Sequence, residues 1–160
     1  FIGSFDVSNA MSNPLKATKF GLPFRHVPTY LAGYYKYKAG DQFTEGGKPV
    51  NGKRDICDIY AIMYETSESV PTLDGTNAFT SPNLISTARI NNAKETNEWT
   101  YFKLPFTTLP GKFIDKEKLM DGKYNIAIVF TSSLEGDHFN GAIGSTLLID
   151  EAELIYHSED

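Results

Sequence analysis

The chain has 160 residues, 41% of them hydrophobic and 22% charged, and its formal net charge is −5 at pH 7. This length and balance predict one globular domain with a core of its own, and the negative charge argues against a nucleic-acid partner, because phosphate binding needs clustered Lys and Arg. No apolar run, Ile126 to Phe130 among them, approaches the length of a transmembrane helix, and a single cysteine, Cys57, rules out an internal disulfide.

Apolar residues recur mostly with a period of two, and clusters of Gly, Pro, Asn, Asp and Ser interrupt them at short intervals. This pattern indicates an all-β antiparallel sandwich or barrel, and we expect a β-sandwich of about eight to ten strands with little helix. One helical turn is predicted in the polar run Asp115–Asp121, because so short a run rarely forms a longer stable helix. The clearest strands, in chain order, are Tyr30–Lys38, Asp55–Tyr64, Leu84–Arg89, Thr100–Phe106, Tyr124–Ser132 and Thr146–Tyr156.

Alternation along these strands predicts which side chains face the core, because successive Cβ atoms point to opposite sides of a sheet. In Asp55–Tyr64 one face is wholly apolar and carries Cys57 as a buried thiol, whereas the other mixes an acid, two phenols and isoleucines. The apolar face is therefore expected to be core. The inward residues predicted in this way are Cys57, Ile59, Ala61, Met63, Phe102, Leu104, Phe106, Tyr124, Ile126, Ile128 and Phe130.

The remaining aromatic residues suit sugar binding, because a pyranose offers an apolar C–H face for stacking and hydroxyls for hydrogen bonds. The alternative is that the rings cover sheet edges or pack beneath loops. Trp99 lies where a loop enters a strand, and we favour its acting as a plug that closes the sandwich, whereas Tyr34 and Tyr60 are expected on an exposed ligand face. The candidate ligand-binding residues are Tyr34, Lys36, Asp58, Tyr60, Trp99 and Tyr101.

Catalysis of glycoside hydrolysis would need two carboxyl groups that flank one sugar bond. Asp55 and Asp58 are three residues apart on a strand and so are expected on opposite faces, as are Asp150 and Glu151. Glu151 and Glu153 share a face, but neighbours on one strand line a sugar from one side only. We therefore predict no catalytic residue, and we favour a protein that is not an enzyme.

Metal binding has one candidate in the sequence. The histidines His26, His138 and His157 fall in no metal-ligand or triad spacing. Asp6 and Asp150 are candidate ligands of a structural Ca²⁺, because binding modules with this fold often tie an early loop to the last strand through oxygen ligands. The favoured alternative is that both aspartates cap turns or form surface ion pairs.

Three long motifs resemble the putative carbohydrate metabolism domain family, PCMD, of gut-anaerobe surface proteins. They are G-x-P-F-x-x-x-P-x-x-L-x-G-Y-Y-K-Y from Gly21 to Tyr37, S-S-x-x-G-D-x-F-x-G-x-x-G-S from Ser132 to Ser145, and the terminal D-E-A-E-L-I-Y. The resemblance covers nearly the whole chain. It implies a jelly-roll β-sandwich like those of carbohydrate-binding modules, spanning residues 1–160 as the C-terminal part of a longer exported protein.

That family is associated with glycan-utilisation genes and with lipoproteins, and its members are labelled as glycoside hydrolases or carbohydrate binders without established catalytic residues. The resemblance therefore implies an extracellular or cell-surface location, with anchoring to the outer membrane through an upstream region. It also implies an oligo- or polysaccharide ligand, and partner proteins of a surface glycan-utilisation complex.

Three functions follow from these observations. The leading hypothesis is a non-catalytic module that holds glycan at a bacterial surface and needs no cofactor. The first rival is a glycoside hydrolase, which would show two carboxyls in one cleft at hydrolytic spacing. The second is a structural interaction module without a sugar ligand, in which the domain's own loops would cover the aromatic face.

Overall fold

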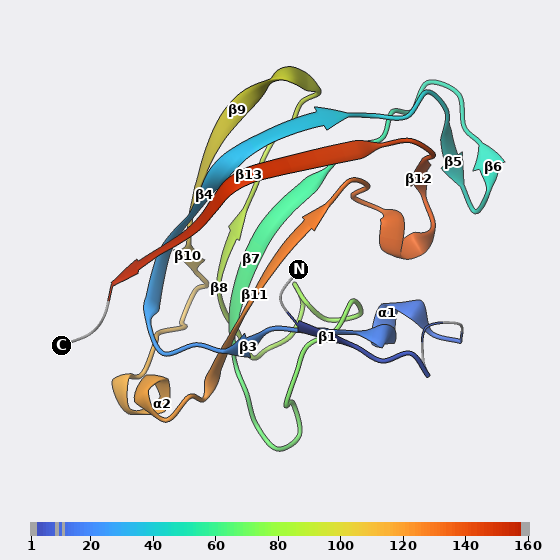
Figure 1. Cartoon of the computed structure of the whole chain (residues 1–160). Coiled ribbons are helices and arrows are strands. Elements are labelled where there is room, and N and C mark those ends of the chain that lie inside the picture. Colours follow the sequence, from blue (N-terminus) through green and yellow to red (C-terminus); the bar gives the residue numbers. More distant parts are fainter. Residues whose placement is uncertain (1–2, 9, 11, 158–160) are drawn as a thin grey trace.

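The computed structural model describes residues 3–8, 10 and 12–157, and within them most of the regular secondary structure is β-strand (Figure 1). None of the helices in these ranges is long and apolar enough to cross a membrane. The elements are β1 Gly3–Phe5, α1 Pro14–Ala17, β2 Thr18–Phe20, β3 Leu22–Pro23, β4 Val27–Lys38, β5 Phe43–Glu45, β6 Lys48–Pro49, β7 Asp58–Glu65, β8 Leu84–Arg89, β9 Thr96–Pro105, β10 Thr107–Thr108, α2 Lys116–Met120, β11 Tyr124–Thr131, the 3₁₀ turn η1 Gly136–His138, β12 Gly141–Ala142 and β13 Thr146–His157.

Two antiparallel sheets form the sandwich, which confirms the predicted fold class. One has the strand order β13-β4-β9 and the other β10-β8-β7-β11-β3, so β4 and β7 are central strands. Figure 1 shows the first sheet arching over the second. All six predicted strands are present, β8 with the predicted ends and the other five with one or both ends shifted. Several strands of two or three residues raise the number in the described ranges to thirteen, above the expected eight to ten.

The main core lies between the two sheets and contains the predicted apolar face of β7. Ile59 and Ala61 are fully buried there, and the Cys57 thiol is buried as expected. From β4 the side chains of Leu31 and Tyr35 point into the same core. Apolar side chains from both sheets thus interdigitate, and their removal from water supplies the main driving force for folding.

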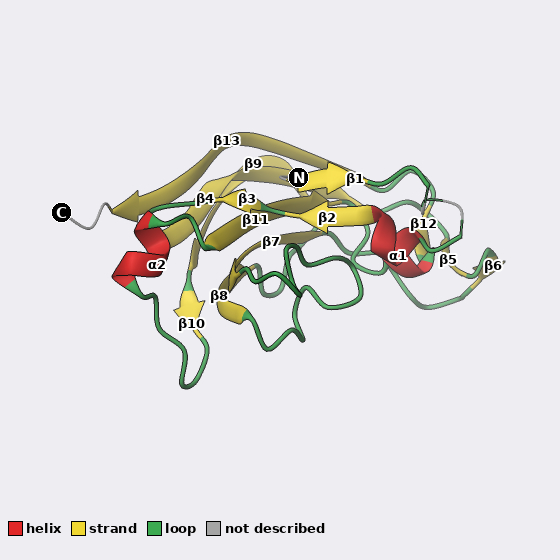
Figure 2. Cartoon of the chain, turned by 90° about the horizontal axis from the view of Figure 1, so that it is seen from below, coloured by secondary structure: helices red, strands yellow, loops and turns green. Residues whose placement is uncertain are grey.

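The second face of β7 is buried as well, against the expectation that its rings are exposed. Tyr60, Ile62 and Tyr64 pack in a second apolar cluster with Phe20 of β2 and with Leu73 from the loop between β7 and β8. Figure 2 shows β1, β2 and α1 lying across this side of the sheet. In these N-terminal segments and in the β7–β8 loop, apolar residues do not recur with a period of two, so the sequence pattern did not predict that they cover the sheet.

The Tyr64 hydroxyl links the sheet by hydrogen bonds to the segments that cover it, at Phe20 and Leu73. It donates a hydrogen bond to the carbonyl oxygen of Phe20 and accepts from the backbone N–H of Leu73 at 3.3 Å and from Asn125 Nδ2 at 3.1 Å. A fully buried hydroxyl without partners would cost stability. Its hydrogen bonds explain why a polar tip is tolerated in this cluster.

Because β7 is buried on both faces, alanine substitutions on either face should be equally costly. We expect Ile59→Ala and Ile62→Ala each to lower the free energy of unfolding by about 2–4 kcal/mol, since each removes buried methylenes and leaves a cavity. Urea denaturation measures both, and the exposed Lys94→Ala serves as a control with a change below about 0.5 kcal/mol. A near-neutral Ile62→Ala would show that the N-terminal cover does not pack on the sheet.

Candidate functional site

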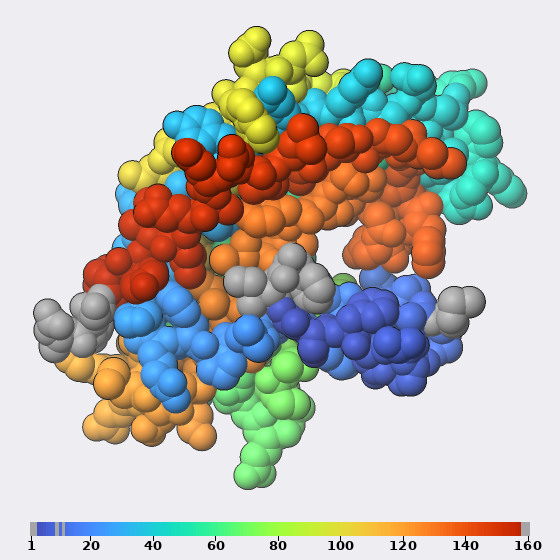
Figure 3. All heavy atoms as spheres, viewed as in Figure 1, coloured from blue at the N-terminus to red at the C-terminus, as the bar shows by residue number. Residues whose placement is uncertain are grey.

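A cleft of about 470 Å³ opens between the outer face of the five-stranded sheet and the N-terminal segment. In Figure 3 the hollow lies between the blue N-terminal residues and the orange residues that follow β11. Both aromatic rings and polar side chains line this cleft. The aromatic lining residues are Phe5, Phe20, Tyr60, Phe79 and Phe130, and the polar ones are Thr18, Asp58, Arg89, Thr131, Ser133 and Asp137.

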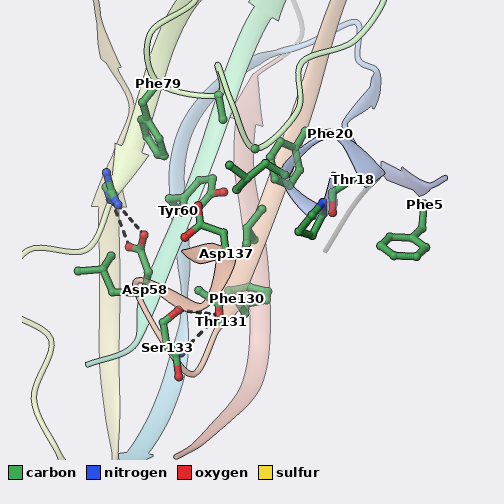
Figure 4. Close-up of a pocket in the computed structure, with 17 residues that line it drawn as sticks. Phe5, Thr18, Phe20, Asp58, Tyr60, Phe79, Phe130, Thr131, Ser133 and Asp137 are labelled. Carbon is green, nitrogen blue, oxygen red and sulfur yellow. Dashed lines mark hydrogen bonds and ion pairs between the residues drawn. The ribbon is translucent and has the colours of Figure 1, made fainter. Parts of the chain in front are cut away.

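A bidentate ion pair joins the neighbouring strands β7 and β8 at this cleft. Arg89 Nη2 donates to Asp58 Oδ2 at 2.7 Å and Nε donates to Oδ1 at 3.2 Å (Figure 4). The Asp58 carboxylate is buried, and the guanidinium compensates its charge. The pair uses two of the five guanidinium N–H groups, and 42% of the Arg89 side chain stays exposed, so the guanidinium keeps donors for a ligand.

Aromatic rings frame the ion pair. The Arg89 guanidinium carbon lies 4.3 Å from the ring centroid of Phe79, and the Phe79 and Tyr60 rings meet edge to face at 4.8 Å. Burial raises the pKa of the Tyr60 hydroxyl to about 12, so it remains a neutral phenol at physiological pH. An aromatic wall beside a hydrogen-bonding pair is the combination that recognises the apolar face and the hydroxyls of a sugar.

Asp137 brings a second carboxyl group to the same cleft. It lies in η1, its side chain is 47% exposed, and His138 Nε2 is 3.8 Å from its Oδ1. In Figure 4 Asp137 lies beside Tyr60, facing the side of the cleft that carries Asp58. Asp137, Arg89 and Phe79 were not among the predicted site residues, although Asp137 belongs to the motif between Ser132 and Ser145.

The buried carboxylate of Asp55 holds the segment that carries Asp137. Its Oδ2 accepts hydrogen bonds from Ser133 Oγ at 2.6 Å, Ser145 Oγ at 2.6 Å and the Ala142 N–H at 2.9 Å. Its Oδ1 accepts from the N–H of Ile56 at 2.9 Å. Both ends of the connection between β11 and β13 are thereby tied to one side chain that precedes β7.

Two glycines, Gly40 and Gly141, lie against the hydrogen-bond network of Asp55. Ser145 Oγ accepts from the Gly40 N–H at 3.0 Å, which links the end of β4 to the same network. A Cβ at Gly40 would lie 2.2 Å from the Ile143 carbonyl oxygen, and one at Gly141 would lie 2.8 Å from Ser133 Oγ. Glycine at both positions therefore permits the close approach on which the Asp55 network depends.

The six predicted ligand-binding residues do not share a face. Asp58 and Tyr60 line the cleft, whereas the other four lie on β4 and β9, on the outer side of the three-stranded sheet. The prediction of a single face is wrong because outward positions on the two sheets of a sandwich point in opposite directions. The group on the three-stranded sheet is Tyr34, Lys36, Trp99 and Tyr101.

Trp99 is not the plug that the sequence analysis favoured. The residue is 44% exposed, and the ammonium nitrogen of Lys36 lies 4.9 Å from its ring centroid. Phe102 on the same strand points inward instead, into the space left by Gly33, where an added Cβ would lie 2.9 Å from the Phe102 ring.

The two proposed calcium ligands each take part in a local turn interaction. Asp6 Oδ1 accepts from the N–H of Ser8 at 3.0 Å, and Asp150 Oδ1 accepts from the N–H of Glu151 at 2.8 Å. No group of three or more His, Cys, Asp or Glu side chains suited to a metal occurs among the residues that the structure describes. The calcium site stays a prediction.

Comparison with known families and structures gives consistent results. A family model described as putative carbohydrate metabolism domain, PCMD, matches residues 1–155. A solved structure described as a putative glycoside hydrolase from Bacteroides thetaiotaomicron VPI-5482 is 89% identical, with a TM-score of 0.98, over 99% of this chain and 46% of that chain. Another with the same description, from Bacteroides vulgatus ATCC 8482, is 48% identical, with a TM-score of 0.92, over 98% of this chain and 63% of that chain.

This chain therefore spans less than two thirds of the length of both solved structures. Comparison with curated proteins gave no match.

The Asp55 network predicts a large effect from a small substitution. Asp55→Asn places an amide N–H₂ group among buried donors and leaves some of them unsatisfied, so we expect the free energy of unfolding to fall by about 2–4 kcal/mol. The exposed Asp41→Asn is the matched control and should change it by less than about 0.5 kcal/mol. Equal urea midpoints for the two variants would contradict the role given to Asp55.

Proposed function

The chain belongs to the putative carbohydrate metabolism domain family, PCMD, and on that premise we propose that it is a non-catalytic module that binds a glycan in the cleft over β7 and β8. The observation that carries the proposal is the Asp58–Arg89 ion pair lying beside the Phe79 ring in one cleft. We place this module in a glycan-utilisation system at the surface of a bacterium. Both similar solved structures come from Bacteroides species.

Each group in the cleft has a defined role in this proposal. The apolar face of a pyranose stacks on Phe79, whose ring orientation is supported by Tyr60 and by the guanidinium of Arg89. Adjacent sugar hydroxyls hydrogen-bond to the free N–H groups of Arg89 and to the Asp58 carboxylate. Asp137 and Thr131 lie around the same hollow and bind further hydroxyls (Figure 4).

The volume of the cleft also limits the size of the glycan that it can bind. A cleft of about 470 Å³ has the size of ordinary small-molecule sites, so it holds one or two sugar rings rather than a long stretch of polysaccharide. With so few stacking and hydrogen-bonding groups, we expect a Kd of about 1 μM to 1 mM.

The binding test uses the uncharged polysaccharide that the wild type retains best in a panel of purified neutral polysaccharides. Phe79→Ala should raise the Kd, measured by calorimetry, at least about tenfold, because it removes the stacking ring. Arg89→Gln should do the same by removing the charged donors. The control Phe113→Ala removes a 72% exposed ring that does not line the cleft, and it should leave the Kd unchanged.

Unfolding midpoints of each variant separate a lost contact from a lost fold. Unchanged binding by folded Phe79→Ala and Arg89→Gln would refute the cleft as the binding site.

Hydrolysis is the second candidate, and one observation favours it: Asp58 and Asp137 both line the cleft. In such a mechanism Asp58, fixed by Arg89, would act as base or nucleophile, and the more exposed Asp137 would act as the acid. Each Asp58 oxygen accepts one N–H of Arg89, which leaves lone pairs for sugar hydroxyls but makes the carboxylate a weaker base and nucleophile, and this favours binding over catalysis.

Release of reducing ends from the bound polysaccharide tests this alternative. We expect none from the wild type, and we expect Asp137→Asn to weaken binding only modestly, by about 1 kcal/mol for the loss of one hydrogen bond. Product release by the wild type that Asp137→Asn abolishes would establish a hydrolase in place of a binding module. Asp137 is the informative position because its exposed side chain can be changed without breaking the buried pair.

A further inference from the structure

The outer face of the three-stranded sheet carries a second group of rings and cations, away from the cleft. Its members come from β4 and β9, which pair with Tyr34 opposite Tyr101 and Ala32 opposite Lys103. Leu31 and Tyr35 alternate with these positions and point into the core. We call this surface the outer platform, and it consists of Tyr30, Tyr34, Lys36, Trp99, Tyr101 and Lys103.

Rings and ammonium groups are paired on the outer platform. Lys36 Nζ lies 4.9 Å from the ring centroid of Trp99, and Lys103 Nζ lies 4.4 Å from that of Tyr30. Between them the Tyr34 and Tyr101 rings lie 5.2 Å apart, and Tyr101 is 54% exposed. These contacts hold both ammonium groups against the sheet and reduce the conformational entropy that binding would cost.

The two lysines lack a carboxylate partner. No ion pair of Lys36 or Lys103 occurs in the part of the chain that the structure describes, whereas Lys53 and Lys118 are paired with glutamates. Asp150 and Glu153 lie on β13 opposite Tyr34 and Ala32, so two carboxyl groups border the outer platform on the side of β4 away from β9. Positive charge and aromatic surface therefore coincide along the boundary between β4 and β9.

We infer that the outer platform is a second binding surface, for a stretch of anionic polysaccharide. Sugar rings stack on Trp99 and Tyr101, and the carboxylate or sulfate groups of the chain contact Lys36 and Lys103. From Tyr30 to Lys36 the strand rises about 20 Å, enough for several sugar units in a row. The cleft differs, because its cation is already neutralised by Asp58 and it adds the acid Asp137.

A single-stranded nucleic acid could use rings and lysines in a similar way. The net charge of −5 and only two lysines among these six residues favour the polysaccharide, because nucleic-acid grooves need a denser set of cations.

The test compares polygalacturonate with its methyl ester, which has the same backbone without charge, and includes chondroitin sulfate for sulfate groups. We expect wild-type protein to bind at least one of the two anionic polymers about tenfold more tightly than the ester, and to weaken as salt rises from about 0.05 to about 0.5 M. The double variant Lys36→Gln/Lys103→Gln should lose this preference, and Trp99→Ala should weaken binding several-fold.

Matched control variants show whether an anionic polysaccharide binds at the outer platform or in the cleft. Lys48→Gln/Lys94→Gln changes two exposed lysines outside the outer platform and should retain the preference. Phe79→Ala should also retain it, since the inference does not depend on the cleft. Loss of anionic binding in Phe79→Ala but not in Lys36→Gln/Lys103→Gln would overturn the inference and leave the cleft proposal standing. Binding of neither anionic polymer more tightly than the ester, or tighter binding of oligo(dT) than of either polymer, would overturn it as well.

Discussion

One buried carboxylate, that of Asp55, fixes the part of the structure on which the candidate site depends. It accepts hydrogen bonds from two serine hydroxyls and a backbone amide that lie far away in sequence, and it belongs to none of the ion pairs found among the described residues. The donors take the place of water around the charge. Because Ser133 and Ala142 flank η1, the position of Asp137 at the cleft follows from this network.

Aromatic residues are mostly buried on the outer face of one sheet and exposed on the outer face of the other, and this difference in exposure decides which rings can contact a ligand. Around β7 the N-terminal segment and the β7–β8 loop bury Tyr60 and Tyr64 and leave a cleft beside them. Over β4 and β9 no described segment covers Trp99 or Tyr101, which stay about half exposed. Tyr and Trp that gather on an exposed face are typical of interaction surfaces.

Local pattern predicted the strands and the inward face of β7, because period-two alternation depends only on neighbours in sequence. It could not place Asp58 against Arg89, since that contact requires knowing that β7 pairs with β8. Nor could it show that Phe20 and Leu73 cover the second face of β7, because neither belongs to a periodic run. The motif from Ser132 to Ser145 did mark a real constraint, and Ser133, Ser145 and Gly141 of this motif pack around Asp55.

The central claim is that a sugar occupies the cleft between β7, β8 and η1. A crystal structure of the chain with a bound oligosaccharide of the uncharged polysaccharide it retains best tests it most directly. We expect electron density for a pyranose stacked on Phe79, with hydroxyls within hydrogen-bond distance of Arg89 and Asp58. An empty cleft, with the oligosaccharide ordered elsewhere on the molecule, would contradict it.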